Sequence, residues 1–365
     1  MAALRMSDIG MKTDTRAPDL SVVVPFFNRA ATIQYTLESV ARARQGMRVE
    51  TILVDDGSTP PAAEQLAGEL HQPDRLIRQE NQGLLFARLN GLAAACGEYV
   101  LFLDSDDLVG PEKFAAQLAA MRVHGADVSY TDCARAELHK PYDAIVPHSP
   151  DHAEETDDSA IFFVRVQPAP HSPVFRTDWL RQLVGAPLFP PSRLYNPVAE
   201  IWFYHIAAPV PAMVVKVPGA HTIGGQHGGA RLTNNWERLG VASLAVMEAF
   251  QRNCPKTAAT KHARQLVGER AFCSWRALPY DFFPEFGHRL LAIWRHSPHG
   301  CLAALGGRKF QALAWLLGPV LAGRVLRRLG GRPYQTSRTL KDTAVFVNWM
   351  AQLPAPKASL SASHL

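Results

Sequence analysis

Cysteine is scarce in this chain, and long apolar runs are missing. The cysteines are odd in number and lack the paired spacing of zinc sites or disulfide frameworks: Cys96, Cys133, Cys254, Cys273 and Cys301. This scatter favours a reducing, cytoplasmic compartment. The apolar run at residues 312–323 is 12 residues long and holds a Gly-Pro break, so it is too short to span a bilayer.

Acidic residues are scarce in the C-terminal third. Residues 231–365 hold 19 Lys or Arg but only 6 Asp or Glu, a net charge of +13, whereas residues 1–230 carry −8. Residues 1–19 contain charges throughout and no apolar core segment, so we expect a disordered leader rather than a secretory signal or an anchor. The overall composition, 47% hydrophobic and 19% charged, is typical of a globular protein.

From Leu20 onward the chain alternates strand and helix patterns, which predicts an α/β fold with a mainly parallel, doubly wound sheet. We expect strands at residues 21–24, 51–54 and 76–77, with a helix at residues 61–70. Asp55 and Asp56 follow the second strand. A capping turn explains one of these acids but not both, so the second one indicates a ligand edge.

Residues 80–108 combine a loop, an amphipathic helix and a buried strand that ends in carboxylates. The helical spacing of Leu85, Leu89, Leu92, Ala93 and Cys96 predicts one apolar face with Arg88 turned elsewhere, and Gly97 is expected to end the helix. Asp104, Asp106 and Asp107 then lie at one strand's carboxyl end. Such crowding favours a divalent cation shared with substrate phosphates, although an exposed acidic turn remains the alternative.

The segments SVVVPFFNRA, ILVDDGST and NQGLLFARLNGLAAACGEYVLFLDSDD resemble the nucleotide-sugar half of GT-A-fold, inverting glycosyltransferases of family 2. The resemblance is dense over residues 20–130 and looser to about residue 230. It implies a Rossmann-like GT-A domain over residues 20–230, followed by a mainly helical basic region at 231–350 and a disordered tail at 351–365. It also implies Mn²⁺ or Mg²⁺ as the cofactor.

The resemblance also implies roles for individual residues. The residues that it assigns to the nucleotide sugar are Pro25, Phe27, Asn28, Asp56, Asn81, Gly83, Arg88 and Asp104. Phe27 takes the place of a base-stacking tyrosine, with packing in the core as the alternative. Asp104, Asp106 and Asp107 match the metal-binding acids, and the glycine-rich stretch at 218–231 offers His221 or His227 as a further ligand, with His221 preferred and a solvated loop as the alternative.

The catalytic base of the family falls on Glu200 in AEIWFYHIAA, where Ala199 replaces the preceding acid and glutamate replaces aspartate. An inverting transfer needs a base for the acceptor hydroxyl and a cation for the departing diphosphate. A helix acid favoured by the macrodipole is the alternative reading of Glu200. These departures also leave open a degenerate, non-catalytic binding or scaffold protein. An enzyme of nucleotidyl transfer to a sugar phosphate needs a basic, glycine-rich loop after the first strand. The segment PFFNRA at that place is not such a loop.

The function predicted is therefore metal-dependent, inverting transfer from a nucleotide-diphosphate sugar to a hydroxyl of a glycan or lipid-linked acceptor, in cell-surface polysaccharide or glycoconjugate synthesis. Basic segments with tryptophan are typical of helices that lie on an anionic membrane surface, here the inner face of the cell membrane; a helical cap on the catalytic domain is the alternative. No motif for nucleic acid is found, so nucleic acid is not expected as a partner.

Overall fold

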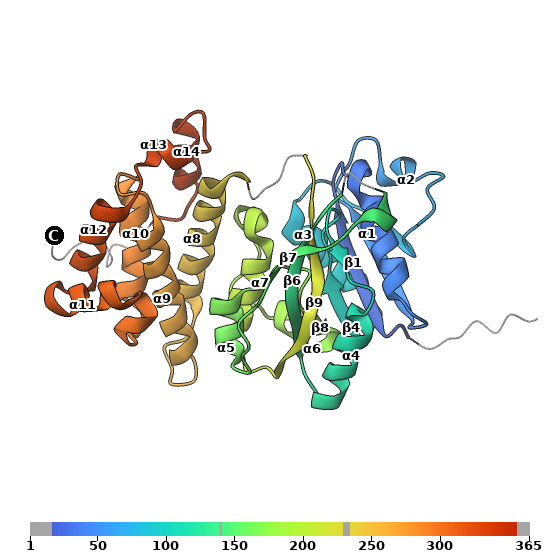
Figure 1. Ribbon diagram of the computed structural model, residues 1–365, viewed down its shortest axis with the longest axis horizontal. Helices are drawn as coiled ribbons and strands as arrows, with labels where there is room; N and C mark the ends of the chain where they lie inside the picture. The colour runs from blue at the N-terminus through green and yellow to red at the C-terminus, as the bar shows by residue number, and fades with distance from the viewer. Residues whose placement is uncertain (1–16, 139–140, 229–233, 356–365) are drawn as a thin grey trace, which may run out of the picture.

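A computed structural model describes residues 17–138, 141–228 and 234–355. One mixed sheet carries the N-terminal half, and a stack of helices follows it at the far end of the molecule (Figure 1). The strand order along the sheet is β3-β2-β1-β4-β8-β6-β9-β5, with β7 paired to β6. The strands are β1 (Leu20–Phe26), β2 (Val49–Asp55), β3 (Arg75–Arg78), β4 (Tyr99–Phe102), β5 (Leu108–Val109), β6 (Val128–Glu137), β7 (His148–Asp151), β8 (Val174–Arg176) and β9 (Val214–Gln226).

The first four strands pair in parallel with one another, and β1 lies between β2 and β4. The chain therefore leaves β1 toward one side to make β2 and returns on the other side to make β4. Such a switch point opens a crevice beyond the carboxyl ends of the two central strands. The predicted α/β, doubly wound arrangement is confirmed here.

Both faces of the parallel strands are covered, which explains their nearly uninterrupted apolar sequence. In β1, Val22 and Val24 pack into one core while Val23 packs into the other, and all three are fully buried. Helices α1 (Ala30–Ala43) and α4 (Lys113–His124) contribute to the first core, and α3 (Leu84–Ala94) to the second. The shorter elements between the strands are α2 (Ala62–Gln65), η1 (Tyr142–Ala144), α5 (Ser159–Ile161), η2 (Phe162–Val166), α6 (Thr177–Gly185), η3 (Arg193–Val198) and α7 (Ala199–Ala207).

The C-terminal part of the chain is helical, as predicted. Its elements are α8 (Trp236–Asn253), α9 (Lys261–Ala277), α10 (Pro284–Arg295), η5 (Leu302–Leu305), α11 (Arg308–Leu317), α12 (Pro319–Gly330), α13 (Tyr334–Ser337) and α14 (Ala344–Ala351). Among the described residues, no helix combines the length and the apolar character that crossing a membrane requires.

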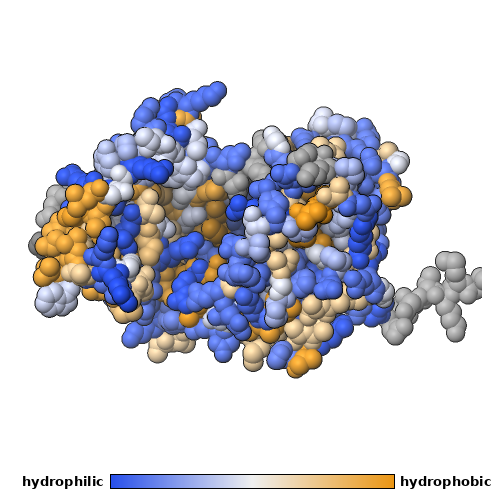
Figure 2. Space-filling model, in the orientation of Figure 1, coloured by the Kyte–Doolittle hydropathy of each residue, from blue (hydrophilic) through white to orange (hydrophobic). Residues whose placement is uncertain are grey.

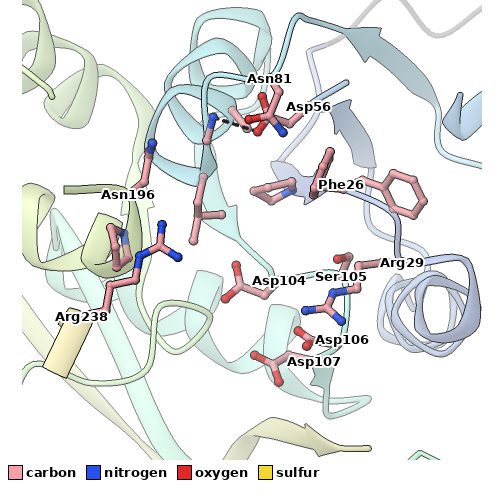
Figure 3. A pocket seen from close by; sticks show the side chains of 16 residues that line it. Phe26, Arg29, Asp56, Asn81, Asp104, Ser105, Asp106, Asp107, Asn196 and Arg238 are labelled. Carbon is pink, nitrogen blue, oxygen red and sulfur yellow. Dashed lines mark hydrogen bonds between the residues drawn. The ribbon is translucent and has the colours of Figure 1, made fainter. Parts of the chain in front are cut away.

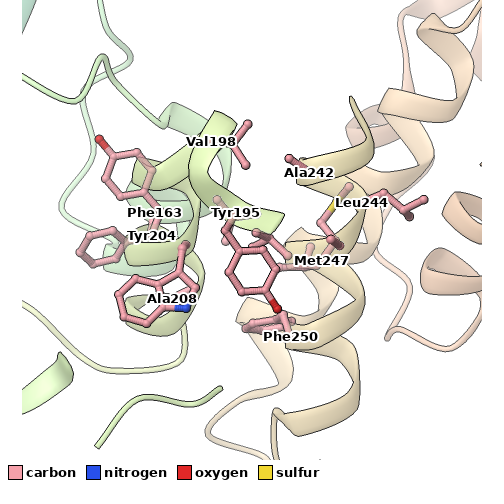
Figure 4. Close-up of a cluster of buried hydrophobic side chains, with 14 of the residues drawn as sticks. Phe163, Tyr195, Val198, Tyr204, Ala208, Ala242, Leu244, Met247 and Phe250 are labelled. Atoms are coloured by element: carbon pink, nitrogen blue, oxygen red, sulfur yellow. The ribbon is translucent and has the colours of Figure 1, made fainter. Parts of the chain in front are cut away.

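The two parts share one hydrophobic core. Tyr195 and Val198 of η3 face Met247 and Phe250 of α8 across the junction (Figure 4). The same buried cluster continues from Phe102 in the sheet through α9 and α10. The division expected between residues 230 and 231 falls outside the described residues, and one buried cluster contains residues from both sides of it.

Several predicted boundaries differ from the observed ones. The second helix is only Ala62–Gln65, much shorter than the expected 61–70. Helix α3 ends at Ala94 rather than at Gly97, because the amides of Cys96 and Gly97 donate to the Ser21 hydroxyl and pull the chain away from the helix axis. Cys96 is consequently exposed and not part of an apolar face.

The chain ends also depart from expectation within the described residues. The expected disorder from residue 351 does not hold for the described residues there: Leu353 is 6% exposed, and Arg289 donates to the carbonyl of Pro354. Residues 356–365 and residues 1–16 of the expected leader lie outside the described residues. Asp19, the last residue of that leader, is held by the Arg48 amide and the Arg122 guanidinium.

Candidate active site

The loops that follow β1, β2 and β4 enclose a cavity of about 490 Å³ at the carboxyl edge of the sheet (Figure 3). Its position matches the switch point between β1 and its two neighbours. The residues that line it are Pro25, Phe26, Phe27, Arg29, Asp56, Asn81, Gly83, Leu84, Ala87, Asp104, Ser105, Asp106, Asp107, Asn196, Pro197 and Arg238.

The two acids after β2 have different tasks. Asp55 accepts hydrogen bonds from the amides of Ser58 and Ala62, at 2.8 and 3.0 Å, so it closes the turn. Asp56 lines the cavity, and its carboxylate accepts from the amides of Gln82 and Gly83, both at 2.8 Å. The loop after β2 is thereby fixed against the loop before α3, and one acid remains at the cavity wall as the sequence predicts.

Gly83 is required by its neighbours. Its backbone has φ +96°, and a Cβ there would lie 2.0 Å from the Asn196 amide nitrogen. That amide donates to the Gln82 carbonyl, and its oxygen accepts from the Leu85 amide. Asn196, from η3, therefore holds the start of α3 at the cavity.

The acidic loop after β4 is held from behind by α1. The hydroxyl of Thr32 donates to the Ser105 carbonyl at 2.9 Å, and that of Thr36 donates to the Asp107 carbonyl at 2.8 Å. The amide of Asp107 donates to the Asp104 carbonyl and closes a turn. These bonds fix the backbone of the loop in a position where Asp104, Asp106 and Asp107 line the cavity.

Arg88 links Asp104 to Glu200. One guanidinium nitrogen lies 2.6 Å from an Asp104 oxygen and another lies 3.5 Å from a Glu200 oxygen. The arginine is only 1% exposed and does not line the cavity, which corrects the expectation that it is turned away from the core face of α3. Burial of a cation is tolerated here because two carboxylates compensate it.

Glu200 lies in the first turn of α7, one turn after the cavity-lining Asn196 and Pro197. Burial raises the pKa of its carboxyl group above the ordinary value, and the nearby Arg88 offsets only part of that increase. The side chain keeps 28% of its surface exposed, so the carboxylate can still be reached. A reachable carboxyl group with a raised pKa is suited to general base chemistry.

The histidine that reaches the acidic loop is His227. Its Nε2 lies 2.9 Å from an Asp106 oxygen. The preferred candidate, His221, is not brought to these carboxylates: its backbone pairs with Gly110, and its ring lies beside Gly219. The antiparallel register of β5 and β9 explains the difference, because β9 runs back toward Asp106 only after Thr222 and Ile223 have paired with β5.

Asp107 is held from two sides. One carboxylate oxygen accepts from the Gly225 amide at 2.9 Å, and the other lies 3.0 Å from Nδ1 of the buried His171. Burial lowers the pKa of His171 to about 3, so this imidazole is neutral at physiological pH. Gly225 is needed because a Cβ there would lie 2.0 Å from the Asp106 carbonyl.

The donor set can be compared with the needs of a divalent cation. Among residues 17–138, 141–228 and 234–355, no group of three His, Cys, Asp or Glu side chains is arranged to hold a metal by itself. The Asp106 and His227 atoms lie 2.9 Å apart, close to the separation of about 3 Å for neighbouring ligands with bonds of about 2.1 Å. The carboxylate oxygen suits Mn²⁺ or Mg²⁺ if substrate phosphates complete the shell, and the imidazole favours the transition metal Mn²⁺ over Mg²⁺. This pair therefore fits such an ion.

The remaining predicted residues divide into two groups. Pro25, Phe27 and Asn81 line the cavity, and the ring of Phe27 is 47% exposed, which contradicts packing in the core. Asn28 is not among the lining residues: its side chain accepts from the Thr59 amide, and its own amide donates to the Ser58 hydroxyl. It fixes the first loop against the second.

The lining residues that were not singled out from the sequence include Arg29, Arg238 and Asn196. Arg29 and Arg238 approach the acidic loop from opposite sides, and Asn196 lies above it (Figure 3). Arg29 follows the motif after β1 and could have been found there. Arg238 and Asn196 are more than 80 residues away from that loop, and no local pattern marks them.

A family model described as glycosyl transferase family 2 matches residues 21–181, a little under half of the chain. The matched span contains the loops after β1, β2 and β4, and thus most of the cavity's acids.

Curated relatives resemble the same part of the chain. The putative glycosyltransferase EpsH of Bacillus subtilis is 39% identical over 98 residues, which is 26% of this chain and 28% of EpsH. The succinoglycan biosynthesis protein ExoO of Rhizobium meliloti is 35% identical over 115 residues, or 31% of this chain and 33% of ExoO. The matched segments thus span a third or less of these relatives.

The fold of nearly the whole chain has a solved counterpart. The crystal structure of S. aureus TarS 1-349 in complex with UDP-GlcNAc aligns over 88% of this chain and 92% of that one, with a TM-score of 0.60 and 20% identity. At this identity the likeness concerns the fold alone. Together with the family match it confirms the predicted GT-A fold with a helical C-terminal region.

Proposed function

We propose that this protein transfers a sugar from a nucleotide-diphosphate sugar to a hydroxyl group of a glycan or lipid-linked acceptor, with inversion at the anomeric carbon. The observation that carries the proposal is the Asp104–Arg88–Glu200 chain at the edge of the nucleotide-side cavity. It ties a cavity-lining acid to a carboxyl group with a raised pKa. A base and a donor site beside it are what an inverting transfer requires.

In the proposed reaction Glu200 accepts the proton of the acceptor hydroxyl as that oxygen attacks the anomeric carbon. The bond from this carbon to the diphosphate oxygen breaks, and the nucleoside diphosphate leaves with the electron pair. Arg88 holds the Glu200 carboxylate in place through its guanidinium. Arg29 and Arg238 border the cavity and would offset negative charge on the leaving diphosphate.

The proposal includes a divalent cation, Mn²⁺ or Mg²⁺, held by Asp106 and His227. When bound, such an ion would supply charge neutralisation for the diphosphate. Asp107 supports this pair through the backbone, since it fixes Gly225 two residues before His227. Asp104 is paired with Arg88, so we assign it to binding of the nucleotide-sugar donor and not to the metal ion.

For the donor, Phe27 offers an exposed ring that can stack on the base, and Asp56 with Asn81 offers polar atoms at the same wall. TarS was solved with UDP-GlcNAc and ExoO is named for succinoglycan biosynthesis, which supports a nucleotide-sugar donor and a polysaccharide product. The donor screen and the acceptor assays described next identify the nucleobase, the sugar and the acceptor.

The test is a thermal-shift screen of nucleotide sugars with and without Mn²⁺, because a ligand that binds only the folded state raises the melting temperature. The proposal predicts one responding donor with a metal-dependent shift. Release of nucleoside diphosphate from that donor is then measured with candidate acceptors. Binding without release, over all acceptors and with Glu200→Gln indistinguishable from wild type, would favour the non-catalytic binding protein instead.

A further inference from the structure

The C-terminal helical region carries an exposed apolar corner. It consists of the end of α11, the turn at Gly318 and the start of α12. Its exposed members are Trp315 at 80%, Leu316 at 68%, Leu317 at 44% and Leu321 at 48% of their surface. Figure 2 shows these elements as the hydrophobic area at the end of the molecule that is farthest from the sheet. Large apolar residues gathered in this way mark an interaction site.

The α11–α12 corner is anchored to the rest of the helical region by buried residues on its other side. Phe310 and Ala314 of α11 and Ala322 of α12 are buried on the opposite side of the hairpin. Gly323 packs so tightly against Trp275 that a Cβ would lie 2.5 Å from the indole. The same hairpin thus has one face that anchors it to α9 and another face left without a partner among the described residues.

Basic residues flank the apolar corner on α12. Leu321, Arg324 and Arg328 are three and four residues apart, so they share one face of the helix, and all three line the same cleft next to α10. His288 from α10 borders this cleft too. Arg324 and Arg328 form no ion pair with any described residue. Arg327 differs, since it donates to the carbonyls of Leu278 and Pro279.

Three of the six acids of residues 231–365 are removed from the surface by burial, whereas Asp281, Glu285 and Asp342 are exposed. Glu237, Glu248 and Glu269 are buried, and each accepts hydrogen bonds from interior partners: Tyr334 and Thr339, Arg289, and Gln265. None of the residues that line the cleft around Arg324 and Arg328 is acidic. The outer surface is therefore more basic than the net charge of +13 for residues 231–365 already indicates.

We infer that the α11–α12 corner docks the protein on an anionic phospholipid surface, with Trp315, Leu316, Leu317 and Leu321 entering the interface and Arg324 and Arg328 binding the phosphate groups. The chemistry of the two parts matches the two layers of such a surface. Apolar side chains insert at the acyl boundary, and arginines attract the negative headgroup layer. A protein partner would have to supply both an apolar pocket and a field of negative charge in the same place.

Vesicle sedimentation tests the inference with the whole chain. Wild type is mixed with vesicles of phosphatidylcholine alone, or of phosphatidylcholine with phosphatidylglycerol, at low and high salt. We expect binding to the anionic vesicles that weakens as salt is added. The double change Arg324→Gln and Arg328→Gln should weaken binding at least tenfold, while Lys256→Gln with Lys261→Gln, an equal loss of charge at exposed positions on the α8–α9 side, should leave most of it.

Insertion is tested separately. Brominated phospholipids quench tryptophans that enter the acyl region, so quenching seen for wild type should be lost in Trp315→Phe. Trp315→Ser with Leu316→Ser should lose vesicle binding, whereas Val123→Ser, at an equally exposed apolar site on α4, should not. Circular dichroism melts confirm that the variants fold.

The inference is overturned if anionic lipid does not increase binding, or if the two arginine changes and the two lysine changes have equal effects. It is also overturned if sedimentation equilibrium without lipid reveals a dimer that Trp315→Ser dissolves. The corner would then be a contact between two copies of this chain. Neither result would bear on the proposed sugar transfer, which is measured with soluble donor.

Discussion

The two ends of this molecule use charge in opposite ways. At the sheet edge the acids Asp56, Asp104 and Asp106 line a cavity, and Arg88, which pairs with Asp104 and Glu200, is buried. In the helical region three of the six acids, Glu237, Glu248 and Glu269, are buried, whereas arginines such as Arg324 and Arg328 face outward. The difference teaches that net charge alone says little about a region's task. The function of a region depends on whether its acidic or its basic side chains are held by interior partners, and on which of them remain available to a ligand.

The prediction with the largest expected effect concerns Glu200. If it is the base, Glu200→Gln should lower kcat on the order of 10²-fold or more while donor affinity stays nearly unchanged, because the amide keeps the shape but cannot accept the proton. Steady-state rates and donor titrations measure both. Glu69→Gln, an exposed acid on the second loop, is the matched control.

The same residue makes a prediction about pH. Because burial raises the pKa of Glu200, the rate should fall as pH drops through a value above the ordinary carboxyl range, and this acid limb should vanish in Glu200→Gln. Glu200→Asp should be weakened and not improved, since a shorter side chain withdraws the carboxylate from the acceptor. A wild-type rate in Glu200→Gln removes this residue from the mechanism.

The next prediction concerns the proposed metal ion at the acidic edge of the sheet. Asp106→Asn should weaken donor binding on the order of 10- to 100-fold in the presence of Mn²⁺, and chelation with EDTA should do the same to wild type. Calorimetry on both proteins, with and without Mn²⁺, gives the four affinities. Four equal values would contradict a shared ion at Asp106 and His227.

A smaller effect tests how rigidly the cavity is built. Gly83→Ala should lower the free energy of unfolding by about 1–2 kcal/mol, because φ is +96° and the new Cβ would meet the Asn196 amide. Gly185→Ala is the control, since it has no neighbour within 4 Å and no such backbone. Denaturant titration compares them, and equal stability of the two variants would mean that the loop relaxes freely.

The last of these effects concerns Lys113, whose amine is buried in the acidic half and is thus an exception to the comparison. Burial lowers its pKa to about 7, and its amine contacts the Ser172 carbonyl and the Thr222 hydroxyl. Between pH 7 and the ordinary lysine pKa the unfolded chain binds the extra proton, so stability should rise with pH. The gain is at most about 1.4 kcal/mol per pH unit.

Lys113→Met should lack this rise, and urea titrations of both proteins at several pH values above 7 make the comparison. The dependence should also flatten below pH 7, where the amine is charged in both states. A slope that is the same in both proteins would show that Lys113 is charged in the folded state.

The sequence allowed the sheet edge to be predicted because local patterns report it. A buried strand followed at once by carboxylates defines the loop at Asp104, and paired acids after β2 define Asp56. The burial of Arg88 could not be predicted in this way. An amphipathic helix pattern predicts that a charged side chain faces water. Arg88 is instead buried, because its charge is compensated by Asp104, after β4, and Glu200, in α7.

Residues from distant parts of the chain were the other gap. His221 lies in β9 and His227 directly follows its last residue, and only the pairing of β9 with β5 decides which of the two meets Asp106. Arg238 reaches the cavity because α8 shares a core with η3 and α7. Such contacts follow from tertiary packing and leave no periodic trace in the sequence.

The most direct test of the central proposal, sugar transfer in the cavity with one base, is the configuration of the product. The responding donor and its acceptor are followed by proton NMR, which separates the two anomers by their coupling constants. The account predicts a product with inverted anomeric configuration, formed together with one nucleoside diphosphate, and made far more slowly by Glu200→Gln. A product with retained configuration, or release of nucleotide with no sugar on any acceptor, would contradict it.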